Sequence, residues 1–249
     1  MVYTVITGIP AMVLTLFAPG SDIVLWFGRH WGRWILATGG VKISCSGLEN
    51  VRPGRTHIFM SNHQSNLDML AIILTMPASF RVVAKKYLFY IPIFGQCIWL
   101  MGMIPINRKR RAAAFASLGR AARKIRSGTS VLFFPEGTRS TDGSLLPFKK
   151  GAFVIASQTG VPIIPVTIEG AGKLLPKGSG LMRPGTVRIR YGRPISTEGY
   201  SLRNKDDLMA VVRAAMLEQL GHREKHAGSV GAGPSRPAAS RDESRSMVT

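Results

Sequence analysis

The sequence predicts an α/β fold in which helices pack on a sheet. Short apolar segments, alternating or continuous, have the character of strands, and longer segments with apolar residues every three or four positions have the period of amphipathic helices. Both kinds of segment occur along the chain, and 249 residues suffice to bury one sizeable core. We therefore expect one α/β domain over residues 41–222, with segments of different character before and after it.

The N-terminal segment is apolar but interrupted. Val2–Phe17 contains Gly8 and Pro10, and it falls short of the roughly 20 residues that a perpendicular membrane-spanning helix needs. A second apolar stretch begins at Ile23 and ends in a mixture of Trp, Arg and His that suits the headgroup zone of a bilayer. We expect residues 1–40 to form a membrane-associated helical hairpin, with two ordinary core helices as the alternative.

The pattern changes from residue 41 onward. Apolar patterning predicts strands at 41–45, 57–60, 131–134, 161–166 and 187–191. Amphipathic helices are expected at 112–126 and 206–220, the second with Asn204 available as its N-cap. The segment 223–249, most of it rich in Gly, Ser, Pro and Ala, has no cluster of large apolar residues, which predicts a disordered tail.

The charge balance predicts an anionic partner. Lys and Arg outnumber Asp and Glu by 33 to 13, and eleven basic residues occur between Asp68 and Glu136 without one acidic residue. A solvated surface normally mixes both signs, so this stretch predicts a cationic face. Nucleic acid, anionic lipid, a phosphorylated substrate and an acidic carrier protein are all candidates for the partner.

The segment Asn62–Asp68 contains a candidate catalytic pair, between a predicted strand and an apolar helical run. Residues five apart on one helix point about 140° away from each other, so His63 and Asp68 meet only if His63 lies in the loop and Asp68 in the first helical turn. There the carboxylate would fix the imidazole tautomer and leave the other ring nitrogen to take a proton from an alcohol. The pair thus predicts a general-base dyad, with a structural histidine as the alternative.

A second candidate site is a turn that follows a predicted strand. The segment Phe133–Ser140 contains an acid, a glycine, a hydroxyl and an arginine. Gly137 allows the backbone to approach a ligand closely, and Arg139 offers phosphate a planar fork of donors. Two further segments are a basic run that begins at Arg108 and the proline-punctuated strand Val161–Val166. Each of these signals is weak alone.

In this order and spacing the four segments resemble the motifs of the glycerolipid acyltransferase family, most closely the bacterial 1-acyl-sn-glycerol-3-phosphate acyltransferases. The resemblance runs from about His57 to Gly170, and its pairing of His-x4-Asp with Phe-Pro-Glu-Gly-Thr-Arg is highly specific. It implies a mixed sheet flanked by helices and a membrane-associated N-terminus. It implies His63 as the general base, Asp68 as its orienting partner, and an acceptor-phosphate site made of Arg108, Glu136, Gly137, Thr138 and Arg139. Asn107 departs from the family, which usually has an acid before the motif arginine.

The reaction implied by the resemblance is transfer of a fatty acyl group from acyl-CoA or acyl carrier protein to the free hydroxyl of lysophosphatidic acid, which makes phosphatidic acid for phospholipid biosynthesis. A thioester is already activated, so the reaction needs a base, a stabilised oxyanion and two substrates held together. Backbone amides near Asn66–Asp68 are candidate oxyanion donors. No cofactor or metal is expected, and Cys45 and Cys97 lack metal-ligand spacing. We expect the chain at the cytoplasmic face of the bacterial inner membrane, with membrane phospholipids as partners.

Three alternatives stay open. Within the family, the acceptor could instead be glycerol 3-phosphate or a lyso-aminolipid. A lipid or thioester hydrolase would use Ser65 as its nucleophile, although a base and a nucleophile two residues apart rarely align and no Gly-x-Ser-x-Gly pattern is present. A nucleic-acid-binding module would rest on net charge alone and lacks a recognised binding motif, so we expect no nucleic acid partner.

Overall fold

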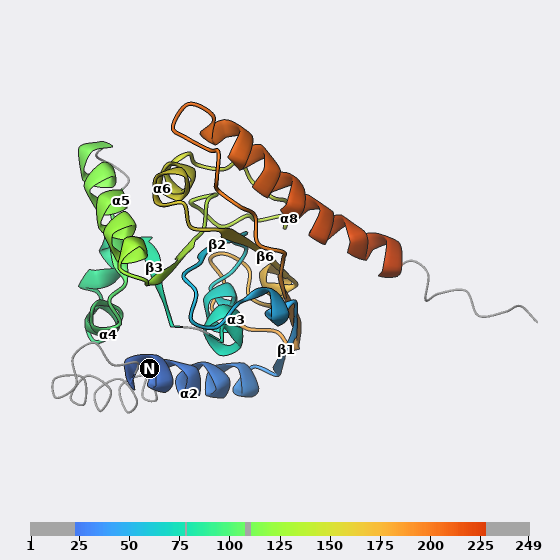
Figure 1. Cartoon of the computed structure of the whole chain (residues 1–249). Coiled ribbons are helices and arrows are strands. Elements are labelled where there is room, and N and C mark those ends of the chain that lie inside the picture. The colour runs from blue at the N-terminus through green and yellow to red at the C-terminus, as the bar shows by residue number, and fades with distance from the viewer. Residues whose placement is uncertain (1–22, 78, 108–110, 228–249) are drawn as a thin grey trace, which may run out of the picture.

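The structure, a computed structural model, describes residues 23–77, 79–107 and 111–227, which form a sheet with helices on both of its faces (Figure 1). The strands are β1 (Val41–Ser46), β2 (Ile58–Ser61), β3 (Phe80–Lys85), β4 (Ile104–Ile106), β5 (Ser130–Phe133), β6 (Ile163–Glu169) and β7 (Gly185–Tyr191). The α-helices are α2 (Ile23–Thr38), α3 (Leu67–Thr75), α4 (Phe94–Leu100), α5 (Arg111–Arg126), α6 (Gly151–Thr159), α7 (Ala171–Leu174) and α8 (Lys205–Ala227). The 3₁₀ helices are η1 (Leu48–Asn50) and η2 (Lys86–Tyr90).

The seven-stranded sheet is mixed, which confirms the fold class that the sequence predicts. Its strand order is β1-β7-β6-β2-β5-β3-β4, and neighbouring strands are parallel except β6 and β7, which are antiparallel. The central strands read as continuous apolar runs because helices cover both of their faces. In β2, Ile58 and Met60 belong to one buried cluster and Phe59 belongs to the other.

Each face of the sheet has its own hydrophobic cluster. The first lies between the sheet and α2, α3 and α7, and it includes the fully buried Phe59 and Ile72. The second lies between the sheet and α5, α6 and α8, and it includes the fully buried Phe153 and Met216. The two amphipathic helices that the sequence predicts, α5 and α8, are therefore on the same face of the sheet (Figure 1).

Helix α2 is the part of the expected N-terminal hairpin that the structure describes, because residues 1–22 lie outside the described residues. Its Leu25 and Leu36 are buried in the first cluster. The guanidinium group of Arg29 donates to the carbonyl oxygens of Ile73 (3.2 Å) and Met76 (3.0 Å), near the end of α3. Helix α2 is thus packed into the α/β domain.

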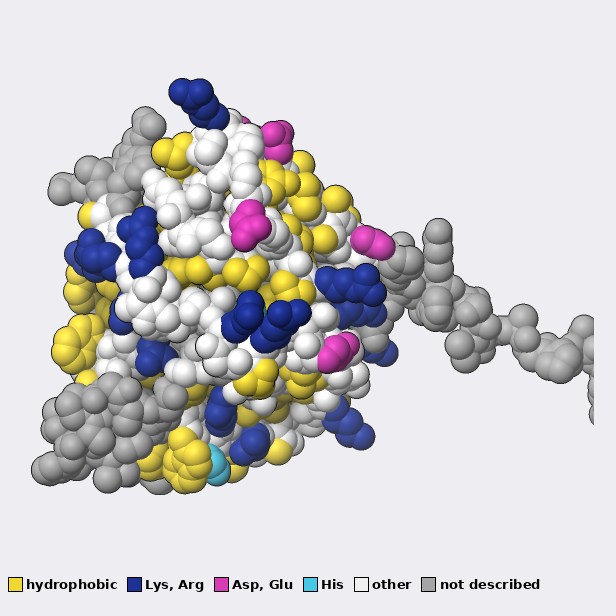
Figure 2. Space-filling view, viewed as in Figure 1, with side chains coloured by type: hydrophobic (Ala, Val, Ile, Leu, Met, Phe, Trp, Pro, Cys, Tyr) yellow, Lys and Arg dark blue, Asp and Glu magenta, His cyan; other side chains and the backbone are white. Residues whose placement is uncertain are grey.

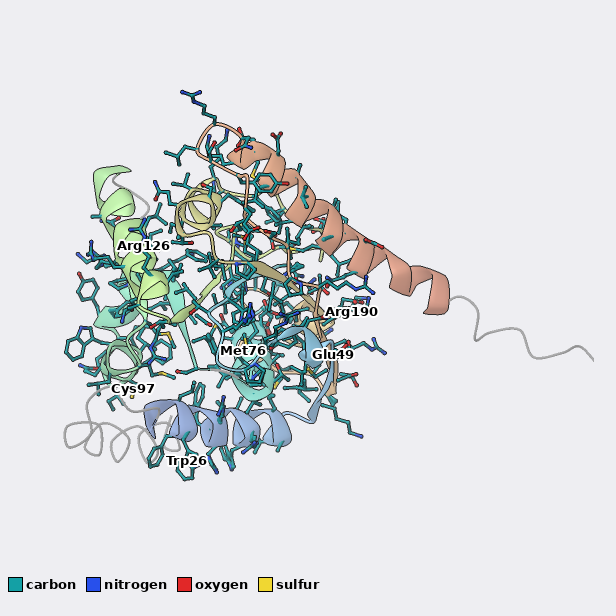
Figure 3. The ribbon with its side chains drawn as sticks, in the orientation of Figure 1. Trp26, Glu49, Met76, Cys97, Arg126 and Arg190 are labelled. Carbon is teal, nitrogen blue, oxygen red and sulfur yellow. The ribbon has the colours of Figure 1, made fainter. Side chains whose placement is uncertain are left out.

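The other side of α2 exposes large aromatic side chains. Trp26 is 54% exposed and Trp34 is 45% exposed, and Figure 3 shows Trp26 pointing away from the body of the molecule. In the three described stretches of the chain, no helix is both long and apolar enough to cross a membrane. Burial on one side and exposed aromatic rings on the other is a pattern typical of a helix at an interface.

Among the described residues, the stretch without acidic residues between Asp68 and Glu136 brings basic side chains to the surface near η2 and along α5. Lys85 directly precedes η2, and its ammonium group lies 5.9 Å from the ring centroid of Tyr87. Lys86 is the first residue of η2, and its ammonium group lies 5.7 Å from the ring centroid of Tyr90. The second place is the last turn of α5, with Arg123, Lys124 and Arg126. Figure 2 shows Lys and Arg side chains spread over the visible face, with scattered Asp and Glu side chains between them.

Helix α8 differs from its prediction at both ends. It runs to Ala227, beyond the expected end at 220 and into the first residues of the expected tail at 223–249, the remainder of which lies outside the described residues. Asn204 does not direct its side chain to the helix amides. Its Oδ1 accepts from the backbone N–H and the hydroxyl of Ser201, and its amide donates to the carbonyl of Gly199. Asn204 therefore closes the preceding loop.

Candidate active site

The two candidate motifs lie in loops that follow neighbouring parallel strands, β2 and β5. The loops that leave the carboxyl ends of these strands, at 62–66 and 134–140, meet at one edge of the sheet. This is where α/β proteins bind their ligands. A hydrogen bond from the N–H of Ser140 to the carbonyl oxygen of His63, 2.8 Å long, joins the two loops directly.

His63 and Asp68 form the expected pair. Asp68 lies in the first turn of α3 and His63 in the loop before it, as the spacing requires. His63 Nδ1 lies 2.7 Å from Asp68 Oδ2. The Asp68 side chain is completely buried, whereas that of His63 keeps 21% exposure. Because Nδ1 faces the carboxylate, Nε2 lies on the other side of the ring, where it can accept a proton from a hydroxyl.

Backbone amides hold the Asp68 carboxylate in place. The same Oδ2 atom accepts hydrogen bonds from the N–H groups of Gln64 (2.6 Å) and Ser65 (2.8 Å). These bonds fold the loop around the carboxylate and fix its orientation. A carboxylate fixed in this way can hold the imidazole in one orientation.

The amides at the start of α3 are largely engaged within the protein. The N–H of Leu67 donates to Ser65 Oγ (3.2 Å), and the N–H of Asp68 donates to the carbonyl oxygen of Ser65 (3.4 Å). These contacts with Ser65 do not support the expectation that the amides of Leu67 and Asp68 stabilise an oxyanion, which stays a prediction.

Ser65 has the geometry of a structural serine. It is completely buried, and its hydroxyl donates to the carbonyl oxygen of Leu175 over 2.7 Å. The single hydroxyl proton is thus directed to a backbone carbonyl and not to His63. This arrangement disfavours the hydrolase alternative, which needs a serine that His63 can deprotonate.

The loop after β5 packs against His63 and brings Arg139 to Asn66. The ring of Phe134 stacks on the imidazole, with centroids 4.2 Å apart and planes inclined by 26°. Gly137 has a φ of 75°, a left-handed conformation that favours glycine and turns the chain back toward α3. Arg139 then donates from its guanidinium group to Asn66 Oδ1 over 3.1 Å.

Glu136 is buried behind His63 and is only 2% exposed. Its Oε1 accepts a hydrogen bond from the N–H of His63 (2.8 Å), and its Oε2 accepts one from the N–H of Leu146 (2.9 Å). Burial raises the pKa of the Glu136 carboxyl to about 7, although the two N–H groups partly oppose this effect.

An apolar cavity of about 570 Å³ opens beside His63. Elements α2, α3, β3 and α4 contribute to its lining, which is mostly apolar and includes Phe27, Trp31, Ile73, Ile98 and Met103. The Lys and Arg side chains among the described lining residues are Lys85, Arg139 and Lys177, and none of these lining residues is Asp or Glu. A cavity of this size and character suits an apolar chain attached to an anionic group.

The structure thus brings most of the predicted site residues together. Gly137, Thr138 and Arg139 line the cavity with His63, but Glu136 does not. Arg108 lies outside the described residues. Within those residues, no group of three or more His, Cys, Asp or Glu side chains could hold a metal ion.

Two residues with contacts in the site have no role in the sequence-based prediction. Phe134 stacks on the imidazole of His63, and Asn62 pairs with the backbone of Ile168 in β6, with its Nδ2 2.9 Å from the carbonyl oxygen and its Oδ1 2.7 Å from the nitrogen. Both lie inside the quoted motifs. Their roles depend on which strands are neighbours, and the sequence does not specify this.

Comparison with known proteins gives consistent results. A family model described as Acyltransferase matches residues 42–169. The chain is 38% identical over 206 residues to the chloroplastic 1-acyl-sn-glycerol-3-phosphate acyltransferase BAT2 of Brassica napus, which covers 78% of this chain and 60% of that protein. It is 31% identical over 227 residues to the 1-acyl-sn-glycerol-3-phosphate acyltransferase of Salmonella typhimurium, with 90% and 91% covered. This chain thus spans less than two thirds of the plant relative's length.

A solved structure gives the same result for the fold. The crystal structure of the 1-acyl-sn-glycerophosphate (LPA) acyltransferase PlsC from Thermotoga maritima matches with a TM-score of 0.71 and 30% sequence identity. The match covers 82% of this chain and 80% of that one.

Proposed function

Because this chain belongs to the 1-acyl-sn-glycerol-3-phosphate acyltransferase family, we propose that it transfers a fatty acyl group from acyl-CoA or acyl carrier protein to the free hydroxyl of lysophosphatidic acid and so makes phosphatidic acid. The observation that carries this proposal is the His63–Asp68 pair, 2.7 Å apart, with His63 on the wall of an apolar cavity that Lys85, Arg139 and Lys177 also line.

In the proposed mechanism, the dyad activates the acceptor hydroxyl. Asp68 holds the imidazole through Nδ1, and Nε2 takes the hydroxyl proton as the oxygen attacks the thioester carbonyl. The tetrahedral intermediate collapses with cleavage of the carbon–sulfur bond, and His63 returns the proton to the departing thiolate. No covalent acyl-enzyme is needed, which agrees with the engaged hydroxyl of Ser65.

The acceptor phosphate is proposed to bind at the loop after β5. Arg139 supplies a forked cationic donor beside Asn66, and Gly137 and Thr138 lie on the same cavity lining. Arg108 is retained as a proposed phosphate ligand from the family resemblance. Among the described lining residues there are Lys and Arg side chains but no Asp or Glu, which supports a phosphorylated acceptor over a neutral one.

We also propose that the enzyme works at a bilayer, at the cytoplasmic face of the inner membrane, with residues 1–40 in contact with membrane phospholipids. Exposed aromatic rings support this: Trp26 and Trp34 on α2, Tyr90 (69% exposed) at the end of η2, and Trp99 (68% exposed) on α4. Helices α2 and α4 also line the cavity, so the acceptor would enter it from the membrane side.

The test is an acceptor panel with purified full-length protein. Lysophosphatidic acid, glycerol 3-phosphate and a lyso-aminolipid are each offered with acyl-CoA and with acyl carrier protein, and products are identified by mass. We expect phosphatidic acid from lysophosphatidic acid as the main product. A main product from another acceptor would assign the chain to a different branch of the family, and free fatty acid alone would indicate a hydrolase.

A further inference from the structure

We propose that Glu136 is a positioning residue that holds the catalytic histidine through its backbone, and that it does not bind the acceptor phosphate. This inference rests on the proposed function, in which His63 is the general base. It reassigns a residue that the family resemblance places in the phosphate site.

Both carboxylate oxygens of Glu136 are occupied by backbone donors. Oε1 accepts from the N–H of His63 over 2.8 Å, and Oε2 accepts from the N–H of Leu146 over 2.9 Å. The side chain is buried, and it is absent from the cavity lining on which Gly137, Thr138 and Arg139 lie. The geometry therefore separates Glu136 from the acceptor phosphate.

The contacts of His63 show what Glu136 contributes. The His63 peptide is held at its N–H by Glu136 and at its carbonyl by the N–H of Ser140. The ring is held on its face by Phe134 and at Nδ1 by Asp68. Asp68 sets the tautomer, whereas the loop after β5 sets where the backbone, and therefore the ring, lies in the cavity wall.

Glu136 also connects this loop to the opposite side of the sheet. The guanidinium group of Arg213, in α8, donates to the carbonyl oxygens of Leu145 and Leu146, each over 2.8 Å. The N–H of Leu146 donates to Oε2 of Glu136, and the N–H of His63 donates to Oε1 of the same side chain. Removing the carboxylate would leave two N–H groups without their acceptor and would let the His63 loop move.

The experiment compares Glu136→Gln and Glu136→Ala with wild type, using lysophosphatidic acid and acyl-CoA as substrates. Gln keeps one accepting oxygen, so its effect should be smaller than that of Ala. Glu198→Gln, at an exposed glutamate, is the matched control. Arg139→Lys is the reference for a lost phosphate contact. For each variant we would measure kcat, both KM values, the pH profile of kcat/KM and the folded fraction at the assay temperature.

We expect kcat per folded molecule to fall about 10-fold in Glu136→Gln and about 100-fold in Glu136→Ala, because small misplacements of a catalytic group cost this much. The acceptor KM should stay within about twofold of wild type, whereas Arg139→Lys should raise it. In both variants the pH profile should lose the contribution of Glu136 itself, whose carboxyl has a pKa of about 7 in the wild type.

Two results would overturn the positioning role. A raised acceptor KM with unchanged kcat would return Glu136 to the phosphate site. A loss of rate fully explained by the unfolded fraction, with an unmoved pH profile, would make Glu136 merely structural. Unchanged turnover in His63→Ala is a different result, because it would overturn the proposed function itself and this inference with it.

Discussion

The helices on the two faces of the sheet differ in how they bury their side chains. Helices α5, α6 and α8 cover a cluster in which Phe153, Leu208, Val212 and Met216 are all fully buried. Helices α2, α3 and α4 instead line a cavity of about 570 Å³, and α2 and α4 expose Trp26 and Trp99 to solvent. The first face is closed, and the second is open to a ligand.

We infer from this difference that one face of the sheet mainly contributes to stability and the other mainly to the proposed reaction. Close packing on the α8 face contributes to the free energy of unfolding, because each buried side chain loses contacts when it is truncated. On the open face the helices do not pack completely against one another, and the cavity between them lies beside His63. Substitutions on the two faces should therefore have different effects, and three predictions test this.

The largest effect is expected at the dyad on the open face. His63→Ala should lower kcat roughly 10²–10⁴-fold, because a positioned base contributes about this much, and Asp68→Asn should also be severe because the amide cannot hold the useful tautomer. The measurement is turnover at saturating lysophosphatidic acid, with a thermal melt to show that each variant is folded. Wild-type turnover in folded His63→Ala would contradict the mechanism.

The closed face should respond through stability. Met216→Ala should lower the free energy of unfolding by about 2–5 kcal/mol, the usual range for truncation of a fully buried methionine. Both KM values should stay unchanged wherever the variant remains folded. Denaturant unfolding and steady-state kinetics on the same preparation check both statements. A changed acceptor KM would show that this face also shapes the cavity and would break the comparison.

The smallest effect is expected at the exposed aromatic rings of α2. The double variant Trp26→Ala, Trp34→Ala should weaken binding to vesicles that contain anionic phospholipid by roughly tenfold, because two large apolar side chains no longer enter the interface. Activity on detergent-dispersed acceptor should change little. Substitution is a cleaner test than deletion of the N-terminus, because α2 also supplies buried residues to the core.

The matched control for the aromatic rings lies on the closed face. Val211 and Leu217 on α8 are 42% and 46% exposed, similar to Trp34. The double variant Val211→Ala, Leu217→Ala should leave vesicle binding unchanged. Equal losses from both double variants would mean that membrane contact is not confined to the open face.

Much of the fold could be predicted because its signals are local. The strands at 41–45, 57–60, 131–134, 161–166 and 187–191 and the helices α5 and α8 each show their own periodicity. The strand β3 and the helix α6 were not predicted. The elements β4 and α4 were also missed, because three and seven residues are too few to show a period. Their place in the fold comes from pairing with β3 and from packing near η2.

For the site, the sequence by itself determined that His63 and Asp68 can meet, and the structure confirms this contact. The five-residue spacing of His63 and Asp68 across a loop and a helix start allows few arrangements, and the dyad was predictable from that spacing. The residues around Arg139 likewise indicated an anion site from their type alone.

Only the tertiary structure decided which polar side chains reach the cavity and which are engaged by other parts of the protein. Glu136 and Arg139 are three residues apart in one turn, yet Arg139 lines the cavity and Glu136 is buried against the N–H groups of His63 and Leu146. Ser65 is likewise engaged by the carbonyl of the distant Leu175. The physical reason is that hydrogen-bond partners far apart in the chain are set by which strands lie side by side, and local sequence patterns carry no information on that order.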